Sequence, residues 1–143
     1  MNFIMNEYLD KLEKTGKSLQ IYKRGKLVFS SSKRGVRPHL DAIEEVGLEE
    51  LKGSVMVDKI IGRAAALLIL YVEAAESYAL VISEAAKQLF DESGIHYSYR
   101  IETESIKTEN GVIYCPFEQI VQSIDEPEKA YHAIKSKIKV LQK

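Results

Sequence analysis

The most apolar stretch of the chain lies in the middle of the sequence and directly follows a polar one. Residues 64–72, AAALLILYV, carry no charge, whereas residues 58–63 read DKIIGR. An apolar run of this kind predicts a helix that is buried on most of its sides. The run is far shorter than the ~20 residues needed to cross a bilayer, so we expect a soluble protein that does not enter a membrane.

Before this segment, the pattern predicts a helix, a β-hairpin and a second short helix. Apolar positions at helical spacing favour an amphipathic helix over residues 2–15. Two apolar runs, 19–21 and 27–29, then flank the polar, glycine-containing turn KRGK, which is typical of a β-hairpin. Pro38 at a first helical position indicates the next helix. Residues 55–57, VMV, predict a short strand that leads into the polar segment.

After the apolar segment, strands and helices alternate. Residues 77–82 predict a buried strand, residues 83–93 an amphipathic helix that ends at Gly94, and residues 96–101 a further strand. Two strands joined through a helix are expected to be parallel, with a right-handed crossover. Acids in the first turn and lysines in the last predict a C-terminal helix over residues 126–141.

Length and composition are typical of a globular protein, and the 143 residues can bury a core of their own, so we expect a single domain over residues 1–143. The order of the predicted elements favours an α/β fold: a three-layer α-β-α sandwich whose mixed sheet begins with the β-hairpin. The net charge of −1 provides no overall field that would attract nucleic acid, so nucleic acid is not an expected partner. The single cysteine, Cys115, excludes an internal disulfide and fits a reducing cytoplasm, where we expect the protein to act.

The polar segment 58–63 is the first candidate for a binding site. Asp58 is positioned to cap the central helix by accepting hydrogen bonds from its first N–H groups. Glycine costs about 1 kcal/mol inside a helix, so Gly62 indicates close packing or the close approach of a ligand. The helix N-terminus, together with Lys59 and Arg63, could hold a phosphate or a carboxylate. The alternative is a capped helix whose two basic side chains are solvated or paired with acids.

Three segments, DKIIGRAAA, YALVISEAA and CPFE, together resemble a small prokaryotic family of unknown function with a cytidine-deaminase-like fold. The resemblance covers roughly residues 17–124. Active zinc deaminases hold their metal with His and Cys at the starts of two successive helices, and a glutamate shuttles protons. The matching segments here, 58–65 and 83–87, contain neither His nor Cys. The resemblance therefore implies a pocket between two helix starts without a metal or other cofactor, and zinc-dependent deamination is not expected.

The second of these helix starts and a later one add three candidate residues. Ser83 can cap its helix, and Glu84 could hydrogen-bond a base or an amine, or pair with Lys59 or Arg63. Cys115 precedes a proline at another helix start, which could lower the pKa of its thiol and make it a nucleophile. The alternative for Cys115 is a small buried hydrophobic residue.

Two further groups of residues give weaker signals. The polar loop 30–38 contains Lys33, Arg34 and Arg37, which could contact phosphates, although a solvated loop is the simpler interpretation. The three histidines have no ligand spacing: His39, His96 and His132.

Three functional hypotheses remain open at this stage. The first is a metal-free, deaminase-like domain that binds a nucleotide-like or other small anionic ligand through Asp58, Lys59, Gly62, Arg63, Ser83 and Glu84. The second is an enzyme of non-zinc chemistry, with Asp58 or Glu84 as acid or base and Cys115 as nucleophile. The third is a structural or regulatory homo-oligomer that associates through the strand at 95–101 or through the C-terminal helix.

Overall fold

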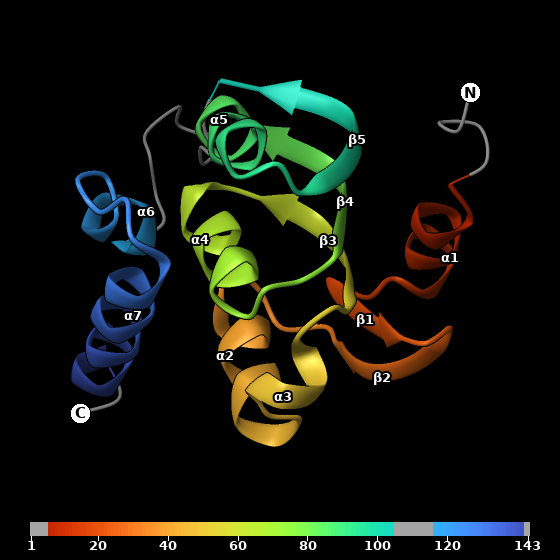
Figure 1. Cartoon of the computed structure of the whole chain (residues 1–143), viewed down its shortest axis with the longest axis horizontal. Helices are drawn as coiled ribbons and strands as arrows, with labels where there is room; N and C mark the ends of the chain where they lie inside the picture. The colour runs from red at the N-terminus through yellow and green to blue at the C-terminus, as the bar shows by residue number, and fades with distance from the viewer. Residues whose placement is uncertain (1–5, 105–115, 142–143) are drawn as a thin grey trace.

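The structure, a computed structural model, describes residues 6–104 and 116–141 (Figure 1). The strands in this part of the chain are β1 (Leu19–Lys23), β2 (Lys26–Ser31), β3 (Val55–Ile61), β4 (Glu76–Ser83) and β5 (His96–Thr103). They form one sheet in the spatial order β2-β1-β3-β4-β5. β1 pairs antiparallel with β2 and with β3, whereas β3, β4 and β5 run parallel to one another. The expected mixed sheet with a starting β-hairpin is therefore confirmed.

Helices cover the sheet on both faces. They are α1 (Glu7–Thr15), α2 (Arg37–Glu45), α3 (Leu48–Leu51), α4 (Arg63–Tyr71), α5 (Glu84–Ser93), α6 (Pro116–Ile120) and α7 (Pro127–Leu141). α1 lies on one face, at the right of Figure 1, and α4 and α5 lie on the other. α2 and α7 pack against the outer side of α4. The arrangement is consistent with an α-β-α sandwich.

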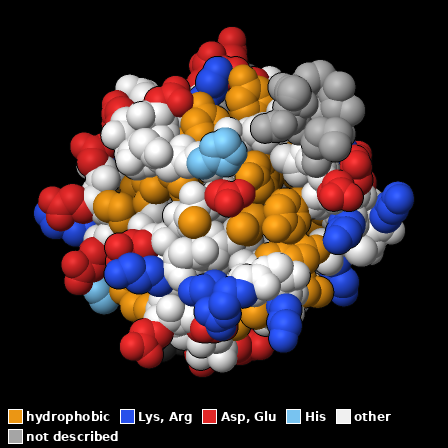
Figure 2. Space-filling view, turned by 45° about the vertical axis from the view of Figure 1, so that its right-hand side comes forward, with side chains coloured by type: hydrophobic (Ala, Val, Ile, Leu, Met, Phe, Trp, Pro, Cys, Tyr) orange, Lys and Arg blue, Asp and Glu red, His pale blue; other side chains and the backbone are white. Residues whose placement is uncertain are grey.

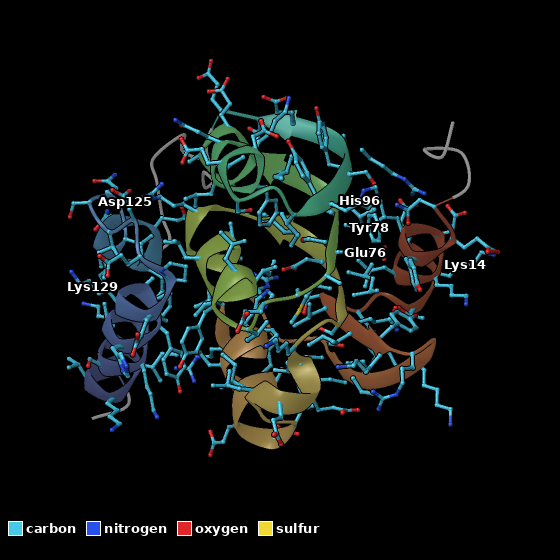
Figure 3. All side chains as sticks on the ribbon, viewed as in Figure 1. Lys14, Glu76, Tyr78, His96, Asp125 and Lys129 are labelled. Atoms are coloured by element: carbon cyan, nitrogen blue, oxygen red, sulfur yellow. The ribbon has the colours of Figure 1, made fainter. Side chains whose placement is uncertain are left out.

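The two cores follow from the alternation of side chains along the strands. Neighbouring residues of a strand point to opposite faces. On β3, Met56 belongs to the core around α4, and Val57 belongs to a smaller cluster with Leu9 and Leu12 of α1. Tyr78 of β4 is in the same smaller cluster, on the α1 side of the sheet in Figure 3. The central strands are thus apolar on both faces because both faces are covered.

α1 covers its face of the sheet only in part. Val55 and Leu80 are half-buried beside the α1 cluster. Figure 2 brings the α1 side of Figure 1 forward and shows apolar side chains in the middle of this face, with a histidine and an acidic side chain among them and most of the charged side chains around them. None of the helices in the described ranges is long and apolar enough to cross a membrane.

The start of the central helix differs from the prediction. Asp58 was expected to cap this helix, but it lies inside β3, and the helix α4 begins only at Arg63. The β-branched pair Ile60 and Ile61 favours a strand and continues the ladder to β4. Gly62, in extended conformation, is the N-cap residue, and no side chain caps the helix from that position. Asp58 is therefore a buried strand residue and not a helix cap.

α4 is buried along most of its length, as its sequence predicts. Its residues from Ala64 to Ile69 are all at most 5% exposed. A helix that is apolar on every side needs cover on every side. The sheet, α2, α5, α6 and α7 provide that cover together.

Most of the other boundaries predicted from the sequence are confirmed within one or two residues. Ser83 caps α5 by accepting a hydrogen bond from the Ala86 N–H, and Gly94 ends the helix in the left-handed region, at φ 80°. The C-terminal helix, expected over 126–141, is α7. The N-terminal helix, expected over 2–15, is observed from Glu7, and residues 2–5 lie outside the described residues.

We expect Leu68→Ala to lower the free energy of unfolding by about 2–5 kcal/mol, because it removes a side chain that is 1% exposed at the centre of the α4 packing. Val140→Ala, at a 65% exposed position of α7, is the control and should change it by less than ~0.5 kcal/mol. Urea unfolding followed by circular dichroism measures both. Equal losses in the two variants would contradict the central position of α4.

Candidate functional site

A cavity of about 400 Å³ lies beside the carboxyl end of β3. Its walls come from the end of α1, the start of β1, the loop between β2 and α2, the first turn of α4, and α6. The lining residues are Gly16, Ser18, Ser32, Arg34, Gly35, Val36, Asp58, Lys59, Ile60, Gly62, Ala65 and Glu118. The volume falls within the range of small-molecule sites, and the carboxyl end of a strand is where open α/β sheets bind ligands.

A buried pair of ionisable side chains lies next to this cavity. The His39 Nε2 of α2 and the Asp58 Oδ2 of β3 are 2.6 Å apart, and the two side chains are only 3% and 8% exposed. An ionised carboxylate can only accept, so the ring nitrogen is the donor. Asp58 lines the cavity, whereas His39 lies behind it. The pair therefore ties α2 to the sheet and fixes one carboxylate oxygen.

The first turn of α4 is bound by a carboxylate from a distant part of the chain. Glu118 of α6 accepts hydrogen bonds from the backbone N–H groups of Arg63 (3.1 Å) and Ala64 (2.9 Å). Burial raises the pKa of Glu118, and the two N–H donors and the Arg63 charge offset this only in part. The N-terminus of α4 is an anion-binding position, and the protein's own side chain fills it.

The side chain of Arg63 also contacts the segment that carries Glu118, but here α4 supplies the donors. It donates to the backbone carbonyls of Val121 (2.8 Å) and Ile124 (2.6 Å) and pairs with Asp125 at 2.7 Å. Asp125 lies at the connection of α6 and α7 (Figure 3). α4 therefore holds the α6–α7 segment through Arg63, and that segment holds α4 through Glu118.

The predicted site residues do not all meet in one place. Asp58, Lys59 and Gly62 line the cavity. The Arg63 side chain is directed to α6 and α7 instead, as in the alternative interpretation of a base paired with an acid.

The second predicted helix start contributes no lining residue to this cavity. Ser83 is 2% exposed and caps α5, and Glu84 is exposed beside Lys87 in a separate shallow hollow. Cys115 lies outside the described residues. Within the described ranges, no group of three His, Cys, Asp or Glu side chains lies close enough to hold a metal ion.

Sequence reasoning missed two residues of the site. His39 showed no ligand spacing, because its partner Asp58 is 19 positions away on another element. Glu118 stands in the sequence only as the last residue of the CPFE segment, and the two N–H groups that it binds lie 54 and 55 positions earlier. Arg34 belongs to the basic loop, for which a solvated position was the simpler interpretation, and it lines the cavity.

Comparisons with known proteins show which family the chain resembles. A family model described as "Domain of unknown function (DUF1893)" matches residues 7–138. Among solved structures, the chain is similar to the crystal structure of TM1506, a DUF1893 family protein from Thermotoga maritima. The two are 31% identical, with a TM-score of 0.82, over 96% of this chain and 91% of that one. No curated protein matches the chain.

We expect the stability of the protein relative to its Glu118→Gln variant to depend on pH. The pKa of Glu118 is raised in the folded protein, so the folded state keeps a proton that the unfolded chain has already released. The stability that Glu118 contributes is therefore highest below the ordinary glutamate pKa of about 4.3 and falls as the pH rises to the raised value. Urea unfolding of both proteins at intervals from about pH 4 to pH 7 measures the difference. If the stability of the protein relative to the variant stays constant or increases with pH, burial does not raise the pKa of Glu118.

Proposed function

The chain belongs to the DUF1893 family, whose function is unknown, and we propose that it binds a small anionic, nucleotide-like ligand in the cavity beside β3. The proposal rests on the charges that line this cavity.

Four charged side chains line the cavity, and only the two acids have partners within the described residues. Asp58 is paired with His39, and the Glu118 carboxylate is bound by two backbone N–H groups. The side chains of Arg34 and Lys59 make no hydrogen bond or ion pair with the part of the chain that the structure describes. Neither basic side chain is paired with an acid of the described residues, so both are available to pair with an anionic ligand.

The apolar part of the cavity wall supports the proposal that the ligand is nucleotide-like. Val36, Ile60 and Ala65 line the same cavity, and Ile60 is 44% exposed although it is large and apolar. A flat apolar body can cover such a wall while an attached anion reaches Arg34 or Lys59. Nucleotides combine these two features in a molecule of suitable size.

The cytidine-deaminase-like designation of the fold is part of this proposal. The order of elements supports it: a starting hairpin, the central helix α4, β4, α5 and the parallel strand β5. The two helix starts contain no His or Cys, so the proposed activity is binding and not zinc-dependent deamination. A nucleotide-like ligand is also in keeping with the cytoplasmic location that we propose.

The other two hypotheses have less support. For the enzyme of non-zinc chemistry, the nucleophile Cys115 lies outside the described residues, and the two alternative acids, Asp58 and Glu84, line different hollows. For a homo-oligomer, the relevant observation is an apolar row across three strands, in which Ile60, Val81 and Ile101 are in register and Ile101 is 60% exposed. Nothing in the described residues indicates what would cover this row.

We expect calorimetric titration to detect binding of nucleoside 5′-monophosphates, and Arg34→Ala to weaken it by roughly tenfold to hundredfold, since one charge-assisted contact is lost. Arg34 is exposed, so the substitution should leave the fold intact. Arg37→Ala is the matched control, because Arg37 follows in sequence but lines a different groove.

Two results would overturn the proposed function. The first is that neither the monophosphates nor inorganic phosphate bind. The second is that the Arg34→Ala and Arg37→Ala variants lose affinity equally. Positive charge outside the cavity would then attract the ligand as strongly as positive charge inside it.

A further inference from the structure

We propose that Asp58, fixed by His39, selects ligands that carry an amino group on the part facing the apolar wall of the cavity. The inference rests on the proposed function and adds to it the chemical group that the ligand presents at its uncharged end.

The first observation is the burial of Asp58. Its side chain is 8% exposed, and it lies among apolar residues of the central strand β3. Moving a carboxylate out of water is costly unless hydrogen bonds replace its hydration. An Asn or an apolar residue at this position of β3 would avoid most of that cost. The carboxylate at position 58 is therefore not explained by packing alone.

The second observation is that only one of its two oxygens has a partner. Oδ2 is bound by His39 at 2.6 Å, and no hydrogen bond to Oδ1 is formed by the described residues. Oδ1 is not sealed off, because the fully enclosed side-chain atoms without a partner in the described part are the hydroxyl oxygens of Ser54 and Ser77. Since Asp58 lines the cavity, Oδ1 is open to whatever enters it.

The charges of the cavity then orient the ligand. A carboxylate oxygen accepts hydrogen bonds and repels anions, so the anionic end of a ligand is favoured near Arg34 and Lys59 and away from Asp58. Asp58 and Ile60 are two positions apart on β3, so their side chains point to the same face of the strand, and both line the cavity. We therefore expect the end of the ligand that meets Asp58 to meet Ile60 as well. On a flat apolar body, the group that donates to a carboxylate is an amino substituent.

His39 acts in this arrangement as a positioning residue. It is 3% exposed, does not line the cavity and lies in the first turn of α2, directly after Pro38. By donating to Oδ2 it leaves the Asp58 side chain a single orientation, in which Oδ1 is the free acceptor. A partner with an N–H donor of similar reach would preserve this orientation.

The test compares ligands that differ only in an amino group. Adenosine 5′-monophosphate is paired with purine riboside 5′-monophosphate, and cytidine 5′-monophosphate with 2-pyrimidinone riboside 5′-monophosphate. We expect the amino member of at least one pair to bind about tenfold or more tightly to the wild-type protein. The 2′-deoxy forms are titrated in parallel, because a ribose hydroxyl is the other donor that Asp58 could bind.

Substitutions then assign the preference to Asp58. In Asp58→Asn, the amide oxygen remains the acceptor for His39, so an NH₂ group faces the cavity and the preference for the amino ligand should disappear. His39→Gln keeps an N–H donor and should retain the preference. Asp41→Asn, the same change on the partly exposed side of α2, is the matched control and should leave the preference unchanged.

Each outcome decides the proposal. If none of the nucleotides binds, the proposed function fails and this inference with it. If nucleotides bind through Arg34 but both members of each pair bind equally, or if only the loss of a ribose hydroxyl lowers affinity, the inference fails while the proposed function stands. If Asp58→Asn does not fold, the wild-type ratios for the two ligand pairs still support or overturn the inference.

Discussion

The structure depends on one requirement: a helix that is apolar on every side must be covered on every side. α4 meets it by packing against the sheet and against the helices α2, α5, α6 and α7. The first N–H groups of α4 also need hydrogen-bond acceptors, because Gly62 has no side chain that could cap them. Glu118 binds two of these groups, and so the segment that covers α4 also completes its N-terminus.

This solution determines what the cavity beside β3 can offer a ligand. The N-terminus of α4 would ordinarily attract an anion, but a side chain of the same protein already occupies it. The positive charge available to a ligand comes from Arg34 and Lys59, which belong to other elements. The acceptor that remains is Asp58, on the strand, with His39 behind it. The site is thus assembled around the start of the helix and not on it.

The elements could be predicted where the signal is local. The hairpin, α5 with Ser83 and Gly94 at its ends, and α7 follow from residues within a few positions of one another. The cap at Asp58 was predicted wrongly because the strand preference of Ile60 and Ile61 outweighs the capping preference of one aspartate. The contacts of the candidate site could not be predicted, because they join residues 19 to 62 positions apart, and only the folded chain brings these together.

The two kinds of contact around the cavity have different consequences for sequence drift among relatives. Glu118 binds backbone N–H groups, which every residue except proline supplies, and Arg63 binds backbone carbonyls besides Asp125, so most of their partners can be substituted without losing the contact. Asp58 and His39 bind each other through side chains, so a change in one leaves the other buried without a partner. A relative that keeps the shape of this cavity but alters its chemistry is therefore expected to have changed positions 39 and 58 together.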